Sequence, residues 1–223
     1  MERVPEPELM DDEAQARAYA EADFEEPNSA FLEHFAACFP DFAPAGYVLD
    51  LGCGPGDIAL RFARAYPGCA VHGVDGSDAM VRLAKQALWR DPELDGCVEF
   101  HLGRIPHLDL PQSNYDAVIS NSLLHHLHDP AVLWRALREV ARRGAPVLVM
   151  DLIRPANTAV LDALVERYAA GAPAVLRRDF TASLHAAFLP EEVRDQLREA
   201  GLEGWTVEQV SDRHLLVAGR TPV

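Results

Sequence analysis

The chain has 223 residues, of which 49% are hydrophobic and 25% are charged, and this composition supports one α/β domain with a full core. Its formal net charge is −15, and ten acidic residues and two arginines fall within the first 26 positions. Phosphate binding needs clustered cations. The charge therefore argues against nucleic acid and anionic membranes as partners and favours a small-molecule substrate.

Targeting and redox features agree with this picture. No apolar run approaches the roughly 20 residues that a membrane span requires, and residues 1–5 contain no apolar signal core, which argues against export. The four cysteines form no close pair and no zinc-like spacing, which is typical of reduced thiols: Cys38, Cys53, Cys69 and Cys97. We therefore predict a cytoplasmic protein.

Residues 1–40 form an acidic leader followed by a helical pattern. We expect residues 1–15 to be loose, and apolar spacing over residues 12–39 predicts helix, with a break at Pro27–Ser29. These two short helices either cover a bound ligand or simply pack on the sheet. Residues 41–223 form the main domain.

The main domain begins with a strand, a glycine turn and a helix. The apolar run 47–51 predicts a strand, glycines follow at positions 52, 54 and 56, and helical spacing begins after Asp57. A turn that merely reverses the chain needs one glycine, whereas three allow backbone N–H groups and a helix N-terminus to approach a ligand. We therefore predict a ligand site at this turn.

Strands and helices then alternate, which predicts a parallel, doubly wound sheet. The predicted strands are 70–76, 96–102, 115–120 and 145–153, and the helices between them include 77–89 and 130–142. A helical insertion over 154–190 interrupts the alternation, with a helix at 156–170 and a mixed stretch at 177–185. After a helix from Pro190 to Gly201, strands 204–210 and 213–220 are joined too closely to be parallel.

The glycine spacing argues against a dinucleotide cofactor. The dinucleotide fingerprint needs a third glycine three positions after its second, and counting from Gly52 and Gly54 this position is Asp57. Asp75 ends the second strand, where a carboxylate can accept two hydrogen bonds from a ribose diol. A nicotinamide or flavin dinucleotide is therefore a poor fit to this turn.

Four motifs resemble class I S-adenosylmethionine-dependent methyltransferases. These are Val48-Leu49-Asp50-Leu51-Gly52-Cys53-Gly54-Pro55-Gly56, Gly73-Val74-Asp75-Gly76-Ser77, Tyr115-Asp116-Ala117-Val118-Ile119-Ser120 and Leu124-His125-His126-Leu127. The resemblance implies a Rossmann-like sheet of seven strands with the last one antiparallel. It also implies S-adenosyl-L-methionine as cofactor and methyl transfer to a small molecule by direct displacement.

The resemblance also assigns the cofactor contacts. Asp50, Gly52 and Gly54 would lie along the methionine moiety, Asp75 would hold the ribose, and Asn121 would stand near the sulfonium. Many relatives have Asp where this chain has Arg104, so adenine recognition there would use backbone groups or guanidinium stacking. The full predicted cofactor set is Tyr19, Asp50, Gly52, Cys53, Gly54, Asp75, Gly76, Ser77, Met80, Gly103, Arg104, Ile105, Asn121 and Ser122.

Candidate catalytic residues are His125, His126 and Asp151, because an acceptor that loses a proton needs a base. The alternative is that the two histidines only pack and bond backbone carbonyls. Adjacent histidines do not share a helix face, and the sequence identifies no further ligand, so we predict no metal. The insertion supplies the predicted substrate contacts, which could instead be solvated charge: Arg154, Tyr168, Arg178 and His185.

Two other functions stay open on the same scaffold. One is a non-catalytic module that binds S-adenosylmethionine, and the other is aminopropyl transfer from a decarboxylated analogue. Aminopropyl transfer to a polyamine should need an acidic pocket, whereas residues 154–190 carry more arginine than acid. The sequence does not identify the acceptor or the methylated atom, and it leaves a homodimer open.

Overall fold

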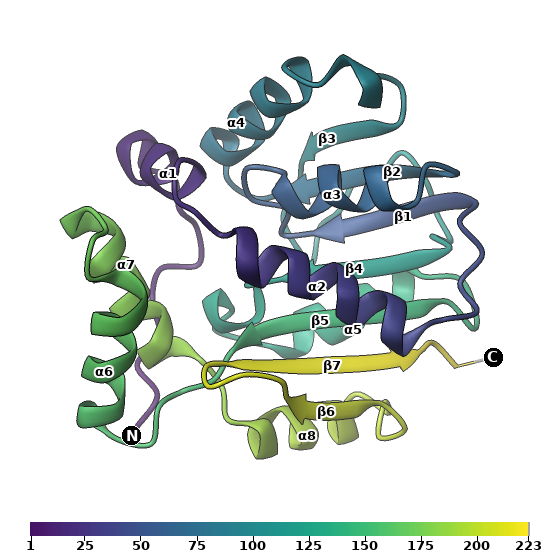
Figure 1. Cartoon of the computed structure of the whole chain (residues 1–223). Coiled ribbons are helices and arrows are strands. Elements are labelled where there is room, and N and C mark those ends of the chain that lie inside the picture. The colour runs from purple at the N-terminus through teal and green to yellow at the C-terminus, as the bar shows by residue number, and fades with distance from the viewer. Residues whose placement is uncertain (223) are drawn as a thin grey trace.

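The computed structural model describes residues 1–222 and contains one seven-stranded sheet (Figure 1). The strand order is β3-β2-β1-β4-β5-β7-β6, in which β7 runs antiparallel to both β5 and β6 while the other pairs are parallel. This confirms the predicted doubly wound sheet with an antiparallel last strand. The strands are β1 Gly46–Leu51, β2 Cys69–Asp75, β3 Val98–Leu102, β4 Ala117–Asn121, β5 Pro146–Leu152, β6 Thr206–Gln209 and β7 His214–Arg220.

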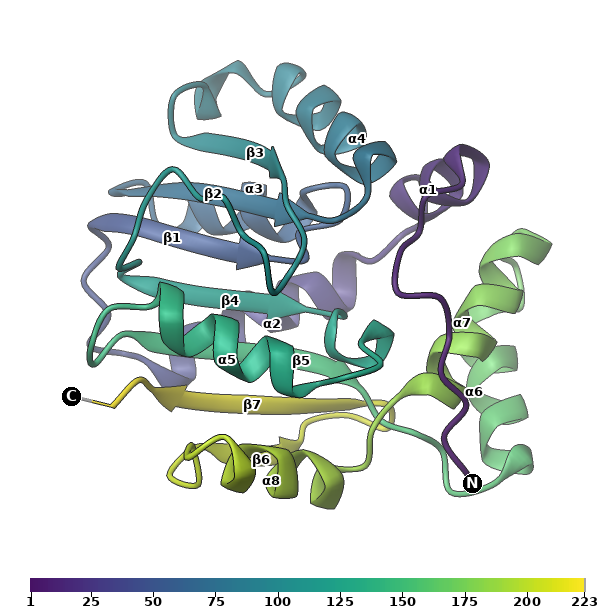
Figure 2. The ribbon, with the colours of Figure 1, turned by 180° about the vertical axis from the view of Figure 1, so that it is seen from behind.

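Helices cover both faces of the sheet. On one face α2 (Glu25–Cys38), α3 (Asp57–Ala65) and α4 (Asp78–Trp89) pack together, with Phe31, Phe35 and Phe62 fully buried against strand residues such as Val48. On the other face lie α5 (Ala131–Val140) and α8 (Pro190–Glu199), which Figure 2 shows in front of the strands. The strands are apolar on both sides because both sides are covered.

A site is expected where the strand order reverses, between β1 and β4. From β1 the chain proceeds to β2 and β3 on one side, and from β4 to β5 on the other. The loops after these strands therefore diverge and leave a crevice at their carboxyl ends, which is where ligands bind in open parallel sheets. The glycine turn and the short 3₁₀ helix η2 (Leu124–His126) lie at this edge.

The insertion after β5 contains two packed helices, α6 (Thr158–Ala169) and α7 (Ala174–Ala186). They share a small apolar cluster of their own, in which Leu161, Leu164 and Leu184 are buried together with Leu152 of β5. The stretch 177–185, whose sequence pattern is mixed, lies within α7. Its pattern is mixed because α7 buries few side chains, so its apolar residues form no continuous stripe.

Two expectations for the N-terminus were wrong. Helix α1 (Glu13–Ala20) ends well before Pro27, and α2 begins at Glu25, so Pro27 lies in the first turn of α2, where a missing N–H is tolerated. Residues 1–10 are placed rather than loose. They run beside α7 (Figure 2), and Val4 N donates to His185 O at 3.0 Å. In the described chain, no helix combines the length and apolar character that membrane crossing requires.

Candidate functional site

The glycine turn is held open by its own backbone. Gly52 N and Cys53 N both donate to Val74 O, at 2.8 and 3.0 Å, which ties the end of β1 to β2. Gly54 has a φ of +52°, and a Cβ placed on it would meet no atom within 4 Å. A side chain at this position would therefore project into empty space, so the turn leaves room for a ligand against its backbone.

A cavity of about 550 Å³ opens beside this turn. It lies between the carboxyl edge of the sheet and the N-terminal elements, since Tyr19 of α1 and Phe24 and Asn28 near the start of α2 also line it. Its size is that of a small-molecule site. Predicted residues in its wall are Tyr19, Asp50, Gly52, Cys53, Gly54, Asp75, Gly76, Met80, Asn121, Ser122 and His126.

Two polar groups in this wall have unused hydrogen-bonding capacity. Asp50 is fully buried, and within residues 1–222 neither of its carboxylate oxygens has a hydrogen-bond partner; the same is true of Asn121 Oδ1. Burial, followed by the charge of Asp75, raises the pKa of Asp50 to about 8. Buried acceptors without donors are costly, so this end of the cavity suits a ligand that brings a cationic donor.

Asp75 lies at the mouth of the turn with both oxygens in use. Oδ2 accepts from Gly54 N at 2.9 Å and Oδ1 accepts from Ser77 N at 2.8 Å. Burial raises its pKa in spite of these two bonds. Ser77 lines neither cavity: it caps α4 by accepting from Met80 N, and its hydroxyl donates to Met10 O. Ser77 therefore positions Asp75 and the N-terminal segment.

A second cavity of about 470 Å³ adjoins the first and contains Gly103, Arg104 and Ile105. Residues Glu8 and Leu9 line both cavities, and a Cβ added at Gly76 would lie only 2.7 Å from Leu9 Cδ2. The N-terminal segment thus passes between the predicted ribose and adenine regions. The Arg104 guanidinium forms an ion pair with Glu8 and is directed to this segment.

The two candidate catalytic histidines differ in their surroundings. His126 lines the first cavity, whereas His125 and Asp151 line neither cavity and are buried. Asp151 accepts from Leu124 N and Leu152 N, both at 2.7 Å, and lies 2.5 Å from His125 Nδ1. The structure therefore places His126 at the first cavity and places Asp151 and His125 behind it, outside both cavity walls.

Charge and burial act differently on these groups. Burial alone would lower the pKa of His125, but the charge and hydrogen bond of Asp151 raise it above its ordinary value. Burial and then the charge of His125 lower the pKa of His126 to about 3. Burial would raise the pKa of Asp151, but His125 holds it below its ordinary value. Burial and neighbouring charge thus shift the pKa values of the two imidazoles in opposite directions.

The predicted substrate contacts from the insertion all lie outside the walls of both cavities. Arg154 is buried and donates to Met1 O, Ala187 O and Glu192, so its donors serve the fold. Tyr168 bonds Asp212, and Arg178 pairs with its neighbour Asp179. His185 has a buried Nδ1 that lacks a partner among the described residues. The structure gives these four residues no role at the cavity.

Sequence reasoning missed the N-terminal contributors to the site. Glu6 lies close to both histidines, at 3.4 Å from His125 Nε2 and 3.3 Å from His126 Nδ1. Glu8 accepts from His128 N at 3.1 Å in addition to pairing with Arg104. An acidic segment without apolar periodicity gives no local signal for such contacts. Only the excess of acid in the leader hinted that it faces cationic groups.

A network beside the cavity joins α2 to α3. Arg61 pairs with Asp57 at 2.7 Å and with Glu25 at 2.6 Å, and Asn28 Nδ2 donates to Asp57 at 2.6 Å. Asp57, the residue that does not fit the dinucleotide fingerprint, therefore holds α2 beside the glycine turn. Sequence spacing could not identify this partnership because its members are 29 residues or more apart, except for Asp57 and Arg61.

Comparisons with known proteins agree with this fold. A methyltransferase domain family matches residues 48–146. The 27-O-demethylrifamycin SV methyltransferase of Amycolatopsis mediterranei (strain S699) is 28% identical over 190 residues, covering 85% of this chain and 65% of that protein. The ubiquinone biosynthesis O-methyltransferase of Acinetobacter baylyi is 31% identical over 161 residues, covering 70% and 63%. The chain thus spans slightly under two thirds of these relatives.

A solved structure has the same fold at lower identity. Phosphoethanolamine N-methyltransferase 2 of Haemonchus contortus, in complex with S-adenosyl-L-methionine, has a TM-score of 0.69 and 15% identity, covering 95% of this chain and 58% of that one. Its strand order, its glycine turn and the family match over residues 48–146 make the chain similar to the class I S-adenosylmethionine-dependent methyltransferases.

Proposed function

We propose that this chain is an enzyme that transfers the methyl group of S-adenosylmethionine to a small-molecule acceptor in the cavity of about 550 Å³. The observation that carries the proposal is the unpaired polar wall of that cavity. Asp50 is a buried carboxyl without a partner in the described chain, and it faces the same space as the open backbone at Gly54. Such a wall fits the ammonium group and the carbon chain in the methionine part of S-adenosylmethionine.

The residues at the carboxyl ends of successive strands would contact successive parts of the cofactor. Asp50 and Gly54 would hold the methionine part, and Asp75 would hold the ribose. Gly103 and Ile105 in the second cavity would hold the adenine. Bound S-adenosylmethionine supplies a methyl group on a sulfonium, whose departure leaves a neutral thioether. The chain's own task is to hold the acceptor in line with that methyl group, which accounts for large rate effects.

The acceptor end of the cavity is formed by Asn121, Ser122 and His126 at the end of β4 and in η2. The cover consists of Tyr19 and Phe24, with Glu8 to Met10 of the N-terminal segment beside them. This cover limits the acceptor to a molecule that fits beneath it and excludes bulk water from the transfer. A small molecule is therefore favoured over a protein side chain or a nucleic acid.

The relatives' names support this class of acceptor. One relative is named a ubiquinone biosynthesis O-methyltransferase, and the other is named a 27-O-demethylrifamycin SV methyltransferase. We therefore propose that the acceptor carries a hydroxyl group. Within the wall, His126 and Asn121 are the groups that can orient such a hydroxyl.

The test has two parts. Titration calorimetry with S-adenosylhomocysteine measures cofactor binding, and we expect one site per chain. The protein is then incubated with S-adenosylmethionine carrying a deuterated methyl group and a pool of small hydroxyl-containing metabolites, and products are searched for a gain of one labelled methyl. Binding without any labelled product would favour a non-catalytic module, and transfer of an aminopropyl group from the decarboxylated analogue would overturn the reaction.

A further inference from the structure

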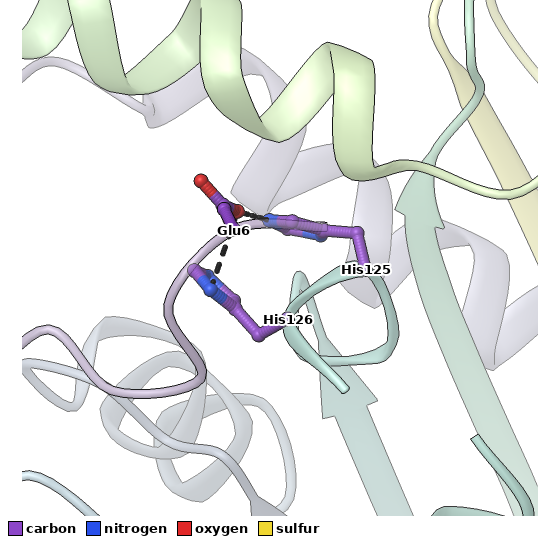
Figure 3. A group of neighbouring side chains, drawn as sticks. All are labelled: Glu6, His125 and His126. Atoms are coloured by element: carbon purple, nitrogen blue, oxygen red, sulfur yellow. Dashed lines mark ion pairs between the residues drawn. The ribbon is translucent and has the colours of Figure 1, made fainter. Parts of the chain in front are cut away.

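Glu6, His125 and His126 bring three ligand atoms together (Figure 3), and of these three residues only His126 lines the first cavity. Glu6 Oε1 is 3.4 Å from His125 Nε2 and 3.3 Å from His126 Nδ1, and all three atoms lie within 4.8 Å of one another. Two ligands on a tetrahedral metal at about 2.1 Å are about 3.4 Å apart. The two Glu6 distances have this length already, and a bound ion would draw the two imidazoles closer together.

The outer partners of this cluster also match those of a metal site. A metal-binding histidine usually donates its second N–H to a carboxylate, which fixes the tautomer and the ring. His125 Nδ1 lies 2.5 Å from Asp151 Oδ1, and Asp151 is itself fixed by two backbone N–H groups. This arrangement leaves Nε2 as the lone-pair nitrogen and directs it to Glu6. Ser183 Oγ donates to Glu6 Oε1 at 3.0 Å and orients that carboxylate.

Burial gives the cluster a reason to bind a cation. The side chains of Glu6, His125 and His126 are 10%, 3% and 18% exposed. A carboxylate buried to this degree is costly unless it is paired with charge. His126 Nδ1 also lies 3.4 Å from Pro7 O, a long contact that a metal would replace.

We infer that Glu6, His125 and His126 form a binding site for a divalent transition metal, with Asp151 as the outer carboxylate behind His125. Two imidazoles and one carboxylate are ligands that suit zinc and its first-row neighbours, and three protein ligands leave positions open. This assignment replaces the expectation of no metal, which rested on the adjacency of the two histidines and on the lack of a further ligand identified from the sequence. That ligand comes from a segment about 120 residues away in sequence.

The metal site is a property separate from methyl transfer, and the binding of Zn²⁺ to it can be measured without cofactor or acceptor. It would also fasten the N-terminal segment to η2, because Glu6 is the only one of the three ligands that lies in that segment. His126 lies in the wall of the cavity as well. A cation held here would therefore stand next to the space that we assign to the acceptor.

The test uses Zn²⁺ alone. Chelator-treated, desalted full-length protein is titrated with Zn²⁺ in competition with a chromophoric chelator, and we expect one equivalent to bind. Glu6→Gln should weaken binding at least tenfold, and Asp151→Asn should weaken it by about ten- to a hundredfold. The matched controls Glu2→Gln, on the same segment, and His34→Ala, on α2, should bind as the parent does. Equal Zn²⁺ affinity in the parent and Glu6→Gln would overturn the site.

A second measurement covers variants that fold poorly. Crystals of the parent protein soaked with Co²⁺ should show one anomalous peak between the three side chains, and a peak only elsewhere would refute the assignment. Glu6→Gln should still bind S-adenosylhomocysteine, because Asp50, Gly54 and Asp75, to which we assign the cofactor, are unchanged in this variant. Loss of Zn²⁺ binding with intact cofactor binding then separates the metal site from the proposed methyl transfer.

Discussion

Asp50 should release a proton when the cofactor binds. Its pKa in the empty cavity is raised to about 8 because burial disfavours the carboxylate and the charge of Asp75 opposes it. The cofactor's ammonium would stabilise the charged form and lower that pKa. Binding should therefore convert a protonated Asp50 into a carboxylate and expel one proton to solvent.

The magnitude follows from the pKa of about 8. At about pH 6.5 such a group is about 97% protonated in the empty cavity, so about one proton per cofactor should leave. The sign is fixed by the direction of the shift: cofactor affinity falls as pH drops below about 8, by up to about tenfold per pH unit. Above that pH, Asp50 is already charged and its contribution to affinity becomes constant.

Calorimetry in a set of buffers measures this proton directly. The apparent enthalpy of S-adenosylhomocysteine binding at about pH 6.5 is plotted against the ionisation enthalpy of each buffer, and the slope counts released protons. We expect a slope near one for the parent, near zero for Asp50→Asn, and the parent value for Asp109→Asn, an exposed carboxyl outside both cavities. A parent slope near zero, or an equal slope in Asp50→Asn, would refute the reasoning.

Three further outcomes are expected. Asp75→Asn should weaken S-adenosylhomocysteine binding by about ten- to a hundredfold, the effect of losing charge-assisted hydrogen bonds, and unchanged calorimetric affinity would contradict its role. Removing residues 1–10 takes Leu9 from between the two cavities, so stopped-flow measurements should show at least tenfold faster cofactor release; an unchanged rate would contradict a covering role. Phe35→Ala should cost about 3–5 kcal/mol in urea unfolding, since Phe35 is fully buried among Phe62, Phe42 and Phe39; a cost under about 1 kcal/mol would contradict that packing.

The parts that the sequence predicted well are those determined by short stretches. The glycine turn, the strand before it and Asp75 at the end of the next strand each follow from spacing within a few residues. Their meeting at one edge then follows from parallel strand geometry. The helix boundary at Pro27 was misplaced for an equally local reason, because proline is read as a break although it is tolerated in a first helical turn.

The parts that could not be predicted depend on partners far apart in the chain. Arg154 has the composition of a substrate-binding residue, yet backbone carbonyls of Met1 and Ala187 take up its donors. Glu6 has the composition of a solvated leader, yet its carboxylate faces two histidines. In both cases the side chain's chemistry is evident from sequence, whereas its partner is set by tertiary packing.

The acidic leader therefore has a structural explanation that composition alone did not suggest. Three neighbouring residues of this segment face the domain. Glu6 lies against the histidine pair, Glu8 lies against Arg104 and His128, and Leu9 lies against Gly76. The negative charge that argues against nucleic acid as a partner thus also forms contacts inside the molecule, where Glu6 and Glu8 hold the N-terminal segment beside the two cavities.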